Sequence, residues 1–563
     1  MLQEFQDCWS WQECLVQTVL RKNAILFLLH FQEKNMDYQK VLIAGQWRNP
    51  KNPTGYFHAV NPARKQTLPE IYPVCDADDI NETIAAGKQA AVELRKVSRK
   101  KLAQFLDRFA DGIEAHADEL VEMAHRETAL PKEQRLRKGE LPRTTDQMRK
   151  AAHAARELSW CRATIETSVN IRSMMGPLDG PVSVFGPNNF PFAFNSIAGG
   201  DFVAAVAAGN PVIAKANTGH PGTTLIFARL AFEALTETGL PPATVQMIYR
   251  TSSELGLQLV SHPDIGASAF TGSKSAGLRL KTAADQAGKP IYLEMSSVNP
   301  IFILPGALEE RSDAIAAELF ASCALGAGQF CTNPGLMILQ KGDPTEKFIT
   351  TLAQAFAGNA PGVLLSPDGP DNIAKAVETL HSAGAVLIVG GKKVEEGEGY
   401  RFANTLMRVD GRTFLANPGA LQTEAFGTAS LIVVVDDLQQ MKEVASVLEG
   451  NLTGCIYSHT NGRDDREYEI LEPELRPKVG RLLNDKAPTG VAVVTSMNHG
   501  GPYPATGHPG FTAVGLPASM LRFAALYCYD NVRPHRLPVE LQNKNPTGSM
   551  WRMIDGQWSQ KDL

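Results

Sequence analysis

One cysteine, Cys331, lies in a loop whose composition suits nucleophilic chemistry. A glycine-rich approach precedes it, and the loop joins a helix-like apolar run at 315–325 to a strand-like run at 336–339. A thiolate is a strong nucleophile, and small neighbours let backbone amides and a substrate approach the sulfur. Most free cysteines are buried structural thiols, so the loop alone leaves both interpretations open.

Three other segments follow strand-like runs and carry amide, hydroxyl or carboxylate side chains that suit a ligand-binding or catalytic site. They are 187–191 (Pro-Asn-Asn-Phe-Pro), 270–277 (Phe-Thr-Gly-Ser-Lys-Ser-Ala-Gly), which opens a helix, and 293–297, which places Glu294 at the end of a strand. Parallel sheets bind ligands beyond the carboxyl ends of their strands, and a helix start can face a phosphate. Taken singly, each segment is equally explained by a turn, a helix cap or a solvated carboxylate.

These segments depend on an alternation of strand-like and helical patterns that begins near residue 181. The expected strands lie at 182–185, 212–214, 245–248, 267–270 and 291–293, and the expected helices lie at 197–208, 222–238, 253–261 and 274–287. Such alternation implies right-handed βαβ units and a parallel sheet. A second alternation from 300 to 457 predicts a second α/β domain, and helical periodicity at 80–130 and 143–158 predicts packing helices.

The composition excludes several classes of function. Among 563 residues, 44% are hydrophobic and 20% are charged, which predicts a sizeable core and two to four domains. The formal net charge of -5, without a basic cluster, argues against nucleic acid as a partner. The eight cysteines form no CxxC pair or Cys/His cluster with zinc-ligand spacing, so we expect no metal and reduced thiols in a cytoplasm.

The first 35 residues read differently from the rest. The apolar run at 24–31 is too short for a membrane span, which needs about 20 residues, and no small-x-small cleavage site follows it. From Met36 the chain reads like a fresh start that leads into a strand at 41–45. We therefore expect residues 1–35 to be an extension or a mis-assigned start, and no membrane partner.

In their order and spacing, the motifs resemble the aldehyde dehydrogenase superfamily, from Val41 to Pro546. The shared motifs are Asn-Phe-Pro at 189–191, Gly-Asn-Pro-Val-Ile-Ala-Lys at 209–215, Phe-Thr-Gly-Ser at 270–273, Leu-Glu-Met at 293–295, Gly-Gln-Phe-Cys at 328–331 and Glu-Ala-Phe-Gly at 424–427. Within the superfamily, the segments 143–147, 488–491 and 499–506 are similar to those of the 2-oxoglutarate semialdehyde (2,5-dioxopentanoate) dehydrogenases.

The resemblance implies a role for each matching catalytic residue. Cys331 attacks the aldehyde, the side chain of Asn189 and the backbone N–H of Cys331 hold the oxyanion, and Glu294 activates the water that hydrolyses the thioester. The presence of Glu294 argues against the branch that passes the acyl group to coenzyme A.

The resemblance also implies a nicotinamide dinucleotide. Lys215 would bond the adenosine ribose, and Thr218 stands where many NAD-dependent members carry a glutamate. A glutamate there would repel a 2'-phosphate by roughly 4 kcal/mol per charge pair at about 4 Å. Thr218, with Arg250 as a possible donor, therefore favours NADP over a weaker use of NAD. The other implied cofactor-binding residues are Gly272, Ser273, Gly277, Glu424 and Phe426.

The aldehyde tunnel is expected to be aromatic with one cation. Arg143 is the candidate for an acidic substrate, although helix arginines are commonly solvated. The chain departs from the common pattern at Asn188, where tryptophan is usual, and at Met295-Ser296-Ser297, where Leu-Gly-Gly is usual. The remaining candidate tunnel residues are Phe190, Phe194, Phe330 and Thr332, for which core packing is nearly as good an explanation.

The sequence therefore predicts an α/β protein with a Rossmann-type cofactor domain, an α/β catalytic domain and a small β oligomerisation element. The expected divisions are 36–293, with an oligomerisation strand at 164–173, then 294–505 and 506–563. The predicted activity is NADP-dependent oxidation of 2-oxoglutarate semialdehyde by a homodimer or homotetramer. A broad aliphatic or fatty aldehyde dehydrogenase, and a non-catalytic dinucleotide-binding protein, remain as alternatives.

Overall fold

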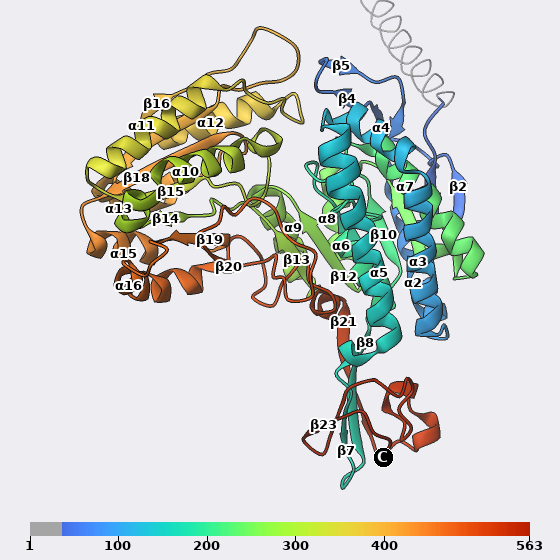
Figure 1. The fold of residues 1–563 in the computed structure, drawn as a ribbon. Helices are drawn as coiled ribbons and strands as arrows, with labels where there is room; N and C mark the ends of the chain where they lie inside the picture. Colours follow the sequence, from blue (N-terminus) through green and yellow to red (C-terminus); the bar gives the residue numbers. More distant parts are fainter. Residues whose placement is uncertain (1–36) are drawn as a thin grey trace, which may run out of the picture.

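The chain forms two seven-stranded sheets and a five-stranded sheet that projects from the body (Figure 1). The computed structural model describes residues 37–563, so the expectations for residues 1–35 and Met36 lie outside the described part. None of the helices described there is long and apolar enough to cross a membrane. The predicted mixed α/β fold is confirmed.

The first sheet has the order β13-β12-β9-β10-β11-β1-β2, in which five strands are parallel. The parallel strands are β9 (Val182–Phe185), β10 (Val212–Lys215), β11 (Val245–Ile248), β12 (Ala267–Thr271) and β13 (Ile291–Glu294), connected by α6 (Gly200–Ala207), α7 (Pro221–Thr238), α8 (Ser253–Ser261) and α9 (Lys274–Gln286). The hairpin of β1 (Val41–Ile43) and β2 (Gln46–Arg48) extends β11 antiparallel. The predicted alternation is correct, whereas this antiparallel extension was not predicted.

The second sheet has the order β16-β17-β18-β15-β14-β19-β20. Its strands are β14 (Ile301–Ile303), β15 (Leu336–Gln340), β16 (Val386–Val389), β17 (Thr405–Asp410), β18 (Ala429–Val435), β19 (Asn451–Tyr457) and β20 (Val479–Asn484). Its helices are α10 (Pro305–Ala324), α11 (Asp343–Gly358), α12 (Gly369–Ser382), α13 (Gly411–Ala416), α14 (Pro418–Leu421), α15 (Leu438–Ser446) and α16 (Asp465–Leu475). The sequence did not predict β16, β17 and β20; β16 and β20 are the two edge strands, which carry weaker apolar patterns than the buried centre, whereas β17 lies inside the sheet.

Helices before β9 cover the first sheet. They are α2 (Ala77–Leu94), α3 (Arg99–Ala115), α4 (Ala117–Thr128) and α5 (Leu141–Glu157), with short strand pairs β3 (Tyr56–Phe57) with β6 (Tyr72–Pro73) and β4 (Val60–Asn61) with β5 (Gln66–Thr67) earlier in the chain. The apolar face of α3 is fully buried and packs against α5 and α7. A π-helix at Lys132–Glu140 leads into α5, and such segments are frequent near functional sites.

The projecting sheet joins two distant parts of the chain. Its strands are β7 (Thr164–Glu166), β8 (Ile171–Pro177), β21 (Ala524–Asp530), β22 (Arg552–Ile554) and β23 (Gln557–Ser559). The buried guanidinium of Arg172 donates to the Leu541 carbonyl oxygen and that of Arg552 to the Gln542 carbonyl oxygen, which pins the C-terminal segment to β8. The role of this sheet in oligomerisation and the division points along the chain stay predictions.

A buried carboxylate at the end of α4 generates a stability prediction. Glu127 is 1% exposed and accepts hydrogen bonds from the N–H groups of Gly222 (2.7 Å) and Thr223 (2.9 Å) at the start of α7. Burial raises its pKa to about 7. The folded chain therefore holds this proton more tightly than the unfolded chain, and stability falls as the pH rises from about 4.5 to about 7, by about 1.36 kcal/mol per pKa unit.

Glu127→Gln removes this titration, so the melting temperature of the variant relative to the wild type should rise between pH 5 and pH 8. Thermal denaturation at both pH values measures the difference. Glu119→Gln, on the exposed face of the same helix, is the matched control and should shift equally at both values. A Glu127→Gln difference that is constant with pH contradicts the prediction.

Candidate active site

The loop that carries Cys331 is held by close backbone packing. After α10 the chain takes left-handed backbone angles at Gly326, Ala327 and Gly328, with φ of 60°, 56° and 73°. A Cβ on Gly328 would lie 2.1 Å from the carbonyl carbon of Gly427, so this position requires glycine. The close approach fixes where the chain turns toward Cys331.

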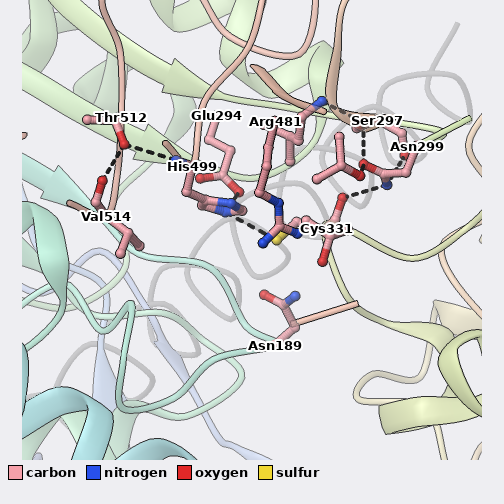
Figure 2. Close-up of polar contacts among 12 residues, drawn as sticks. Asn189, Glu294, Ser297, Asn299, Cys331, Arg481, His499, Thr512 and Val514 are labelled. Atoms are coloured by element: carbon pink, nitrogen blue, oxygen red, sulfur yellow. Dashed lines mark hydrogen bonds and ion pairs between the residues drawn. The ribbon is translucent and has the colours of Figure 1, made fainter. Parts of the chain in front are cut away.

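Three side chains from distant parts of the chain meet at the thiol (Figure 2). The Sγ atom of Cys331 lies 3.4 Å from Nε2 of His499, and the same nitrogen lies 2.9 Å from Oε1 of Glu294. The side chains of Glu294 and His499 are each 2% exposed. Oε2 of Glu294 is buried without a hydrogen-bond partner among residues 37–563.

The sequence analysis gave roles to Cys331 and Glu294 but none to His499. Glu294 ends β13, Cys331 precedes β15, and His499 lies beyond β20, so no local pattern connects the three. The signal that was available is the position of His499 at the head of the segment His-Gly-Gly-Pro-Tyr-Pro, which the resemblance had already singled out.

The environment of Cys331 favours the protonated thiol. Burial raises the pKa of Cys331 well above its usual range, and the charge of Glu294 raises the pKa further. The charge of Arg143 acts in the opposite direction. A nearby proton acceptor is therefore needed to generate the thiolate, and His499 is in contact with the sulfur.

The amide of Asn189 faces Cys331 in Figure 2. Nδ2 of Asn189 donates to the Gln329 carbonyl oxygen at 2.9 Å, and the main-chain carbonyl oxygen of Asn189 accepts from Nη2 of Arg135 at 2.8 Å. Arg135 forms an ion pair with Glu140 at 2.9 Å, and both residues lie in the π-helix. The sequence analysis missed this pair, whose contacts arise only in the fold.

Glu140 extends this network to the main chain after Asn189. Its Oε2 accepts from the N–H groups of Phe192 (3.0 Å) and Ala193 (3.1 Å). A carboxylate that binds two backbone amides and one guanidinium holds its loop more firmly than neutral hydrogen bonds would. The π-helix thus fixes the segment that presents Asn189.

Two buried amides hold the main chain at Cys331 from the other side. Nδ2 of Asn299 donates to the carbonyl oxygens of Cys331 and Asn333, each at 2.9 Å. Oδ1 of Asn451 accepts from the N–H groups of Val298 (2.9 Å) and Asn299 (3.1 Å). The N–H of Cys331 makes no hydrogen bond within the described chain, so it is available to a ligand.

An aromatic cluster lies beside the thiol. The ring of Phe190 stands edge-on to Phe194 at 5.3 Å and to Phe330 at 5.1 Å, and the ring of Phe194 lies 5.6 Å from that of His499. Thr332, the other predicted tunnel residue, is 1% exposed. Its side chain is bonded to the main chain, because its Oγ1 accepts from the N–H of Gly490 at 3.3 Å.

Arg143 faces this cluster from α5. Its guanidinium carbon lies 5.6 Å from the ring centre of Phe190 and 5.4 Å from that of Phe194. Its Nε and Nη2 atoms are buried, and no partner for them occurs in the part of the chain that the structure describes. Buried polar atoms are almost always paired, so this guanidinium is free to take an anionic ligand.

The predicted cofactor-binding residues at β10 form a second, cationic cluster. Burial and the charge of Arg250 lower the pKa of Lys215 to about 8. Arg250 and Thr218 are exposed, and no carboxylate of residues 37–563 pairs with Lys215 or Arg250. Two adjacent cations without a counter-ion fit a phosphate-bearing ligand.

The other predicted cofactor-binding residues fall into two groups: Gly272, Ser273 and Gly277 have local structural roles, and Glu424 and Phe426 line a cavity. Ser273 caps α9, where its Oγ accepts from the N–H of Ala276 at 3.4 Å. A Cβ on Gly277 would lie 2.9 Å from Sδ of Met295, and one on Gly272 would lie 2.7 Å from the Phe270 ring, so side-chain packing already explains both glycines.

Glu424 and Phe426 line a narrow cavity beside the second sheet, together with Gly328 and Phe330. Burial raises the pKa of Glu424 to about 7, against hydrogen bonds from Ser296 and Ser297 that lower it. The charge of Glu424 also raises the pKa of Cys331, which places Glu424 within electrostatic reach of the thiol. The cavity and the thiol therefore belong to one site.

These opposing charges generate a prediction about thiol reactivity. Glu294→Gln removes a charge that raises the pKa of Cys331, so the thiolate fraction at pH 7.5 should increase, about tenfold for each unit by which the pKa falls. Arg143→Gln should have the opposite effect. Iodoacetamide incorporation at Cys331, followed by mass spectrometry with the exposed Cys528 as internal reference, measures both rates. Equal rates in both variants contradict this electrostatic account.

Comparisons with known proteins identify the family of the chain. The profile of the aldehyde dehydrogenase family matches residues 47–471. The alpha-ketoglutaric semialdehyde dehydrogenase 2 of Azospirillum brasilense is 37% identical over 515 residues, which cover 89% of this chain and 96% of that protein. The alpha-ketoglutaric semialdehyde dehydrogenase of Acinetobacter baylyi is 34% identical over 532 residues, which cover 92% and 99%.

The solved structure of lactaldehyde dehydrogenase from Escherichia coli has the same fold. It superposes with a TM-score of 0.75 at 22% identity and covers 87% of this chain and 98% of its own. The resemblance predicted from the motifs is therefore confirmed. With a family match over most of its length and relatives above one-third identity, the chain belongs to the aldehyde dehydrogenase family.

Proposed function

We propose that this aldehyde dehydrogenase oxidises 2-oxoglutarate semialdehyde to 2-oxoglutarate and prefers NADP. The observation that carries the proposal is the half-buried guanidinium of Arg143 beside the aromatic cluster, whose Nε and Nη2 are buried without a hydrogen-bond partner among residues 37–563. The names of the Azospirillum brasilense and Acinetobacter baylyi relatives point to the same substrate. The assignment of the individual site residues is part of this proposal.

In the first step, Cys331 adds to the aldehyde carbon. Nε2 of His499, unprotonated in the reactive tautomer with the ring proton on Nδ1, takes the thiol proton and then donates it in a hydrogen bond to Oε1 of Glu294, 2.9 Å away. The negative charge that develops on the aldehyde oxygen is held by the free N–H of Cys331 and the amide of Asn189. Removing one such donor typically costs about 2.7–4 kcal/mol of barrier.

In the second step, the thioester on Cys331 is hydrolysed. A bound nicotinamide dinucleotide supplies the hydride acceptor that makes this thioester. Oε2 of Glu294 is the free carboxylate oxygen, so it orients and deprotonates the attacking water while Oε1 stays with His499. This base supports hydrolysis in preference to acyl transfer to coenzyme A.

Substrate selection rests on Arg143. The distal oxo-acid of the substrate carries a carboxylate, and a charge-assisted hydrogen bond in a buried site contributes about 1.5–3 kcal/mol. The second candidate is a broad aliphatic or fatty aldehyde dehydrogenase, which the apolar surface of Phe190, Phe194 and Phe330 favours. The two candidates differ in whether a carboxylate on the substrate matters.

Cofactor selection rests on the cations at the end of β10. Lys215 and Arg250 lie close enough for one to lower the pKa of the other, and Thr218 leaves the neighbouring position uncharged. A 2'-phosphate would relieve the repulsion between the two cations. We also propose that the protein is a homodimer or homotetramer assembled through the projecting sheet.

The substrate proposal predicts a preference that depends on Arg143. With wild-type protein, kcat/KM should be higher for 2-oxoglutarate semialdehyde than for hexanal, as measured by absorbance of the reduced cofactor. Arg143→Gln should lower kcat/KM for the oxo-acid semialdehyde by about 10- to 150-fold, the equivalent of one charged hydrogen bond, and affect hexanal much less. Arg149→Gln, a solvent-facing arginine on the same helix, is the control. If hexanal is the better substrate of the wild type, the fatty aldehyde candidate replaces the proposal.

The cofactor proposal predicts a shift with charge at position 218. Thr218→Glu should lower the ratio of kcat/KM for NADP to that for NAD by at least about tenfold, because like charges near the 2'-phosphate repel even when solvent screens them. Thr218→Gln has the same size without the charge and should leave the ratio close to that of the wild type. An unchanged ratio in Thr218→Glu refutes the assignment.

A further inference from the structure

Cys331, His499 and Glu294 together offer the side-chain groups that bind zinc in proteins. Sγ of Cys331, Nε2 of His499 and a carboxylate oxygen of Glu294 all lie within 4.8 Å of one another. A thiolate, an imidazole and a carboxylate are the three side-chain groups that bind Zn²⁺ in proteins, and catalytic zinc sites use three protein ligands with an open fourth position. The sequence predicts no metal here, because 205 residues separate Glu294 from His499 and 168 separate His499 from Cys331.

The spacing of these atoms is close to that of a tetrahedral site. Bonds of about 2.3 Å to sulfur and about 2.0–2.2 Å to nitrogen and oxygen place the ligand atoms about 3.3–3.6 Å apart. The sulfur and nitrogen are 3.4 Å apart, and the nitrogen and Oε1 of Glu294 are 2.9 Å apart. A metal would need only a small separation of His499 and Glu294 and a movement of the carboxylate toward the sulfur.

A second observation points to a ligand at this place. Oε2 of the buried Glu294 has no hydrogen-bond partner among the described residues, so the carboxylate retains an unused acceptor inside the site. The ring of His499 lies 5.6 Å from that of Phe194 and its Nε2 lies 2.9 Å from Oε1 of Glu294, while the backbone N–H of His499 donates to Oγ1 of Thr512 at 3.0 Å. The imidazole is therefore already oriented, which lowers the entropic cost of binding.

We propose that Cys331, His499 and Glu294 bind one Zn²⁺ ion in the substrate-free enzyme and that this binding reversibly blocks catalysis. The thiol loses its proton to solvent, and lone pairs of the thiolate sulfur, the neutral Nε2 and a carboxylate oxygen bind the metal without any change of oxidation state. The bound metal occupies both the nucleophile and the base. The proposal does not depend on which aldehyde the enzyme oxidises.

The surrounding charges make the site reversible. The thiolate and carboxylate together neutralise the two charges of Zn²⁺, but the guanidinium groups of Arg143 and Arg481 both interact with Cys331 electrostatically and oppose a further cation. Figure 2 shows the Arg481 side chain beside Cys331. We therefore expect a chelator to remove the metal and restore full activity, unlike for a structural zinc site.

Cobalt provides a direct test, because a thiolate bound to Co²⁺ gives a charge-transfer absorption in the near ultraviolet. Metal-free full-length protein titrated with Co²⁺ alone should develop this band with one equivalent, and Zn²⁺ should abolish it by displacement. Zn²⁺ should also protect Cys331 from iodoacetamide, and EDTA should reverse both the protection and the loss of activity. Absence of the band, or protection that EDTA does not reverse, overturns the proposal.

Variants separate a three-ligand site from simple binding to a thiol. Cys331→Ala should abolish the cobalt band, whereas Cys528→Ser, at the exposed cysteine of β21, should leave it unchanged. His499→Phe retains an aromatic ring against Phe194, and Glu294→Gln retains the shape of the carboxylate. Each should weaken Zn²⁺ protection of Cys331 by at least about 100-fold, since even loss of an outer-shell partner costs 10- to 100-fold. Equal Zn²⁺ protection in both variants and the wild type overturns the proposal.

Discussion

The contact of Cys331, His499 and Glu294 in a water-poor centre is the constraint on which the rest of the structure depends. A buried thiol resists ionisation, so Cys331 is reactive only if a proton acceptor remains in contact with its sulfur, as His499 does. The contact therefore needs rigid support from every segment that supplies it. The parallel sheets provide this support, because Glu294 stands at the carboxyl end of β13 in the first sheet and Cys331 stands just before β15 in the second.

Buried amides and backbone packing connect the two sheets at this point. Asn451 holds the segment after Glu294, Asn299 holds the carbonyl oxygen of Cys331, and the absence of a side chain at Gly328 lets the thiol loop press against Gly427. These contacts hold the main chain in place and leave the N–H of Cys331 free. A rearrangement at any of them would displace the sulfur from His499, even though none of them touches a reacting atom.

Arg135 and Arg143 lie against the same aromatic cluster but have different roles. Arg135 is paired with Glu140 and bound to the main chain of Asn189, so its charge is neutralised and its role is positional. Arg143 lies over the same ring of Phe190, and its Nε and Nη2 have no hydrogen-bond partner in the part of the chain that the structure describes. Burying an unpaired guanidinium destabilises a fold, and such exceptions concentrate at functional sites. At β10, likewise, the charge of Arg250 lowers the pKa of Lys215, and no carboxylate of residues 37–563 pairs with either cation.

The sequence by itself determined the alternation of strands and helices, the loop position of Cys331 and the strand-end position of Glu294, because hydrophobic periodicity and turn residues are local signals. Only the tertiary structure brought His499 to the thiol, paired Arg135 with Glu140 and buried Arg143, since these contacts join residues that are far apart or depend on the π-helix. The antiparallel pairing of β1 with β11, and of β2 with β1, was also visible only in the structure, since it depends on backbone hydrogen bonds at a sheet edge. Local patterns specify elements, whereas burial and charge pairing depend on which elements meet.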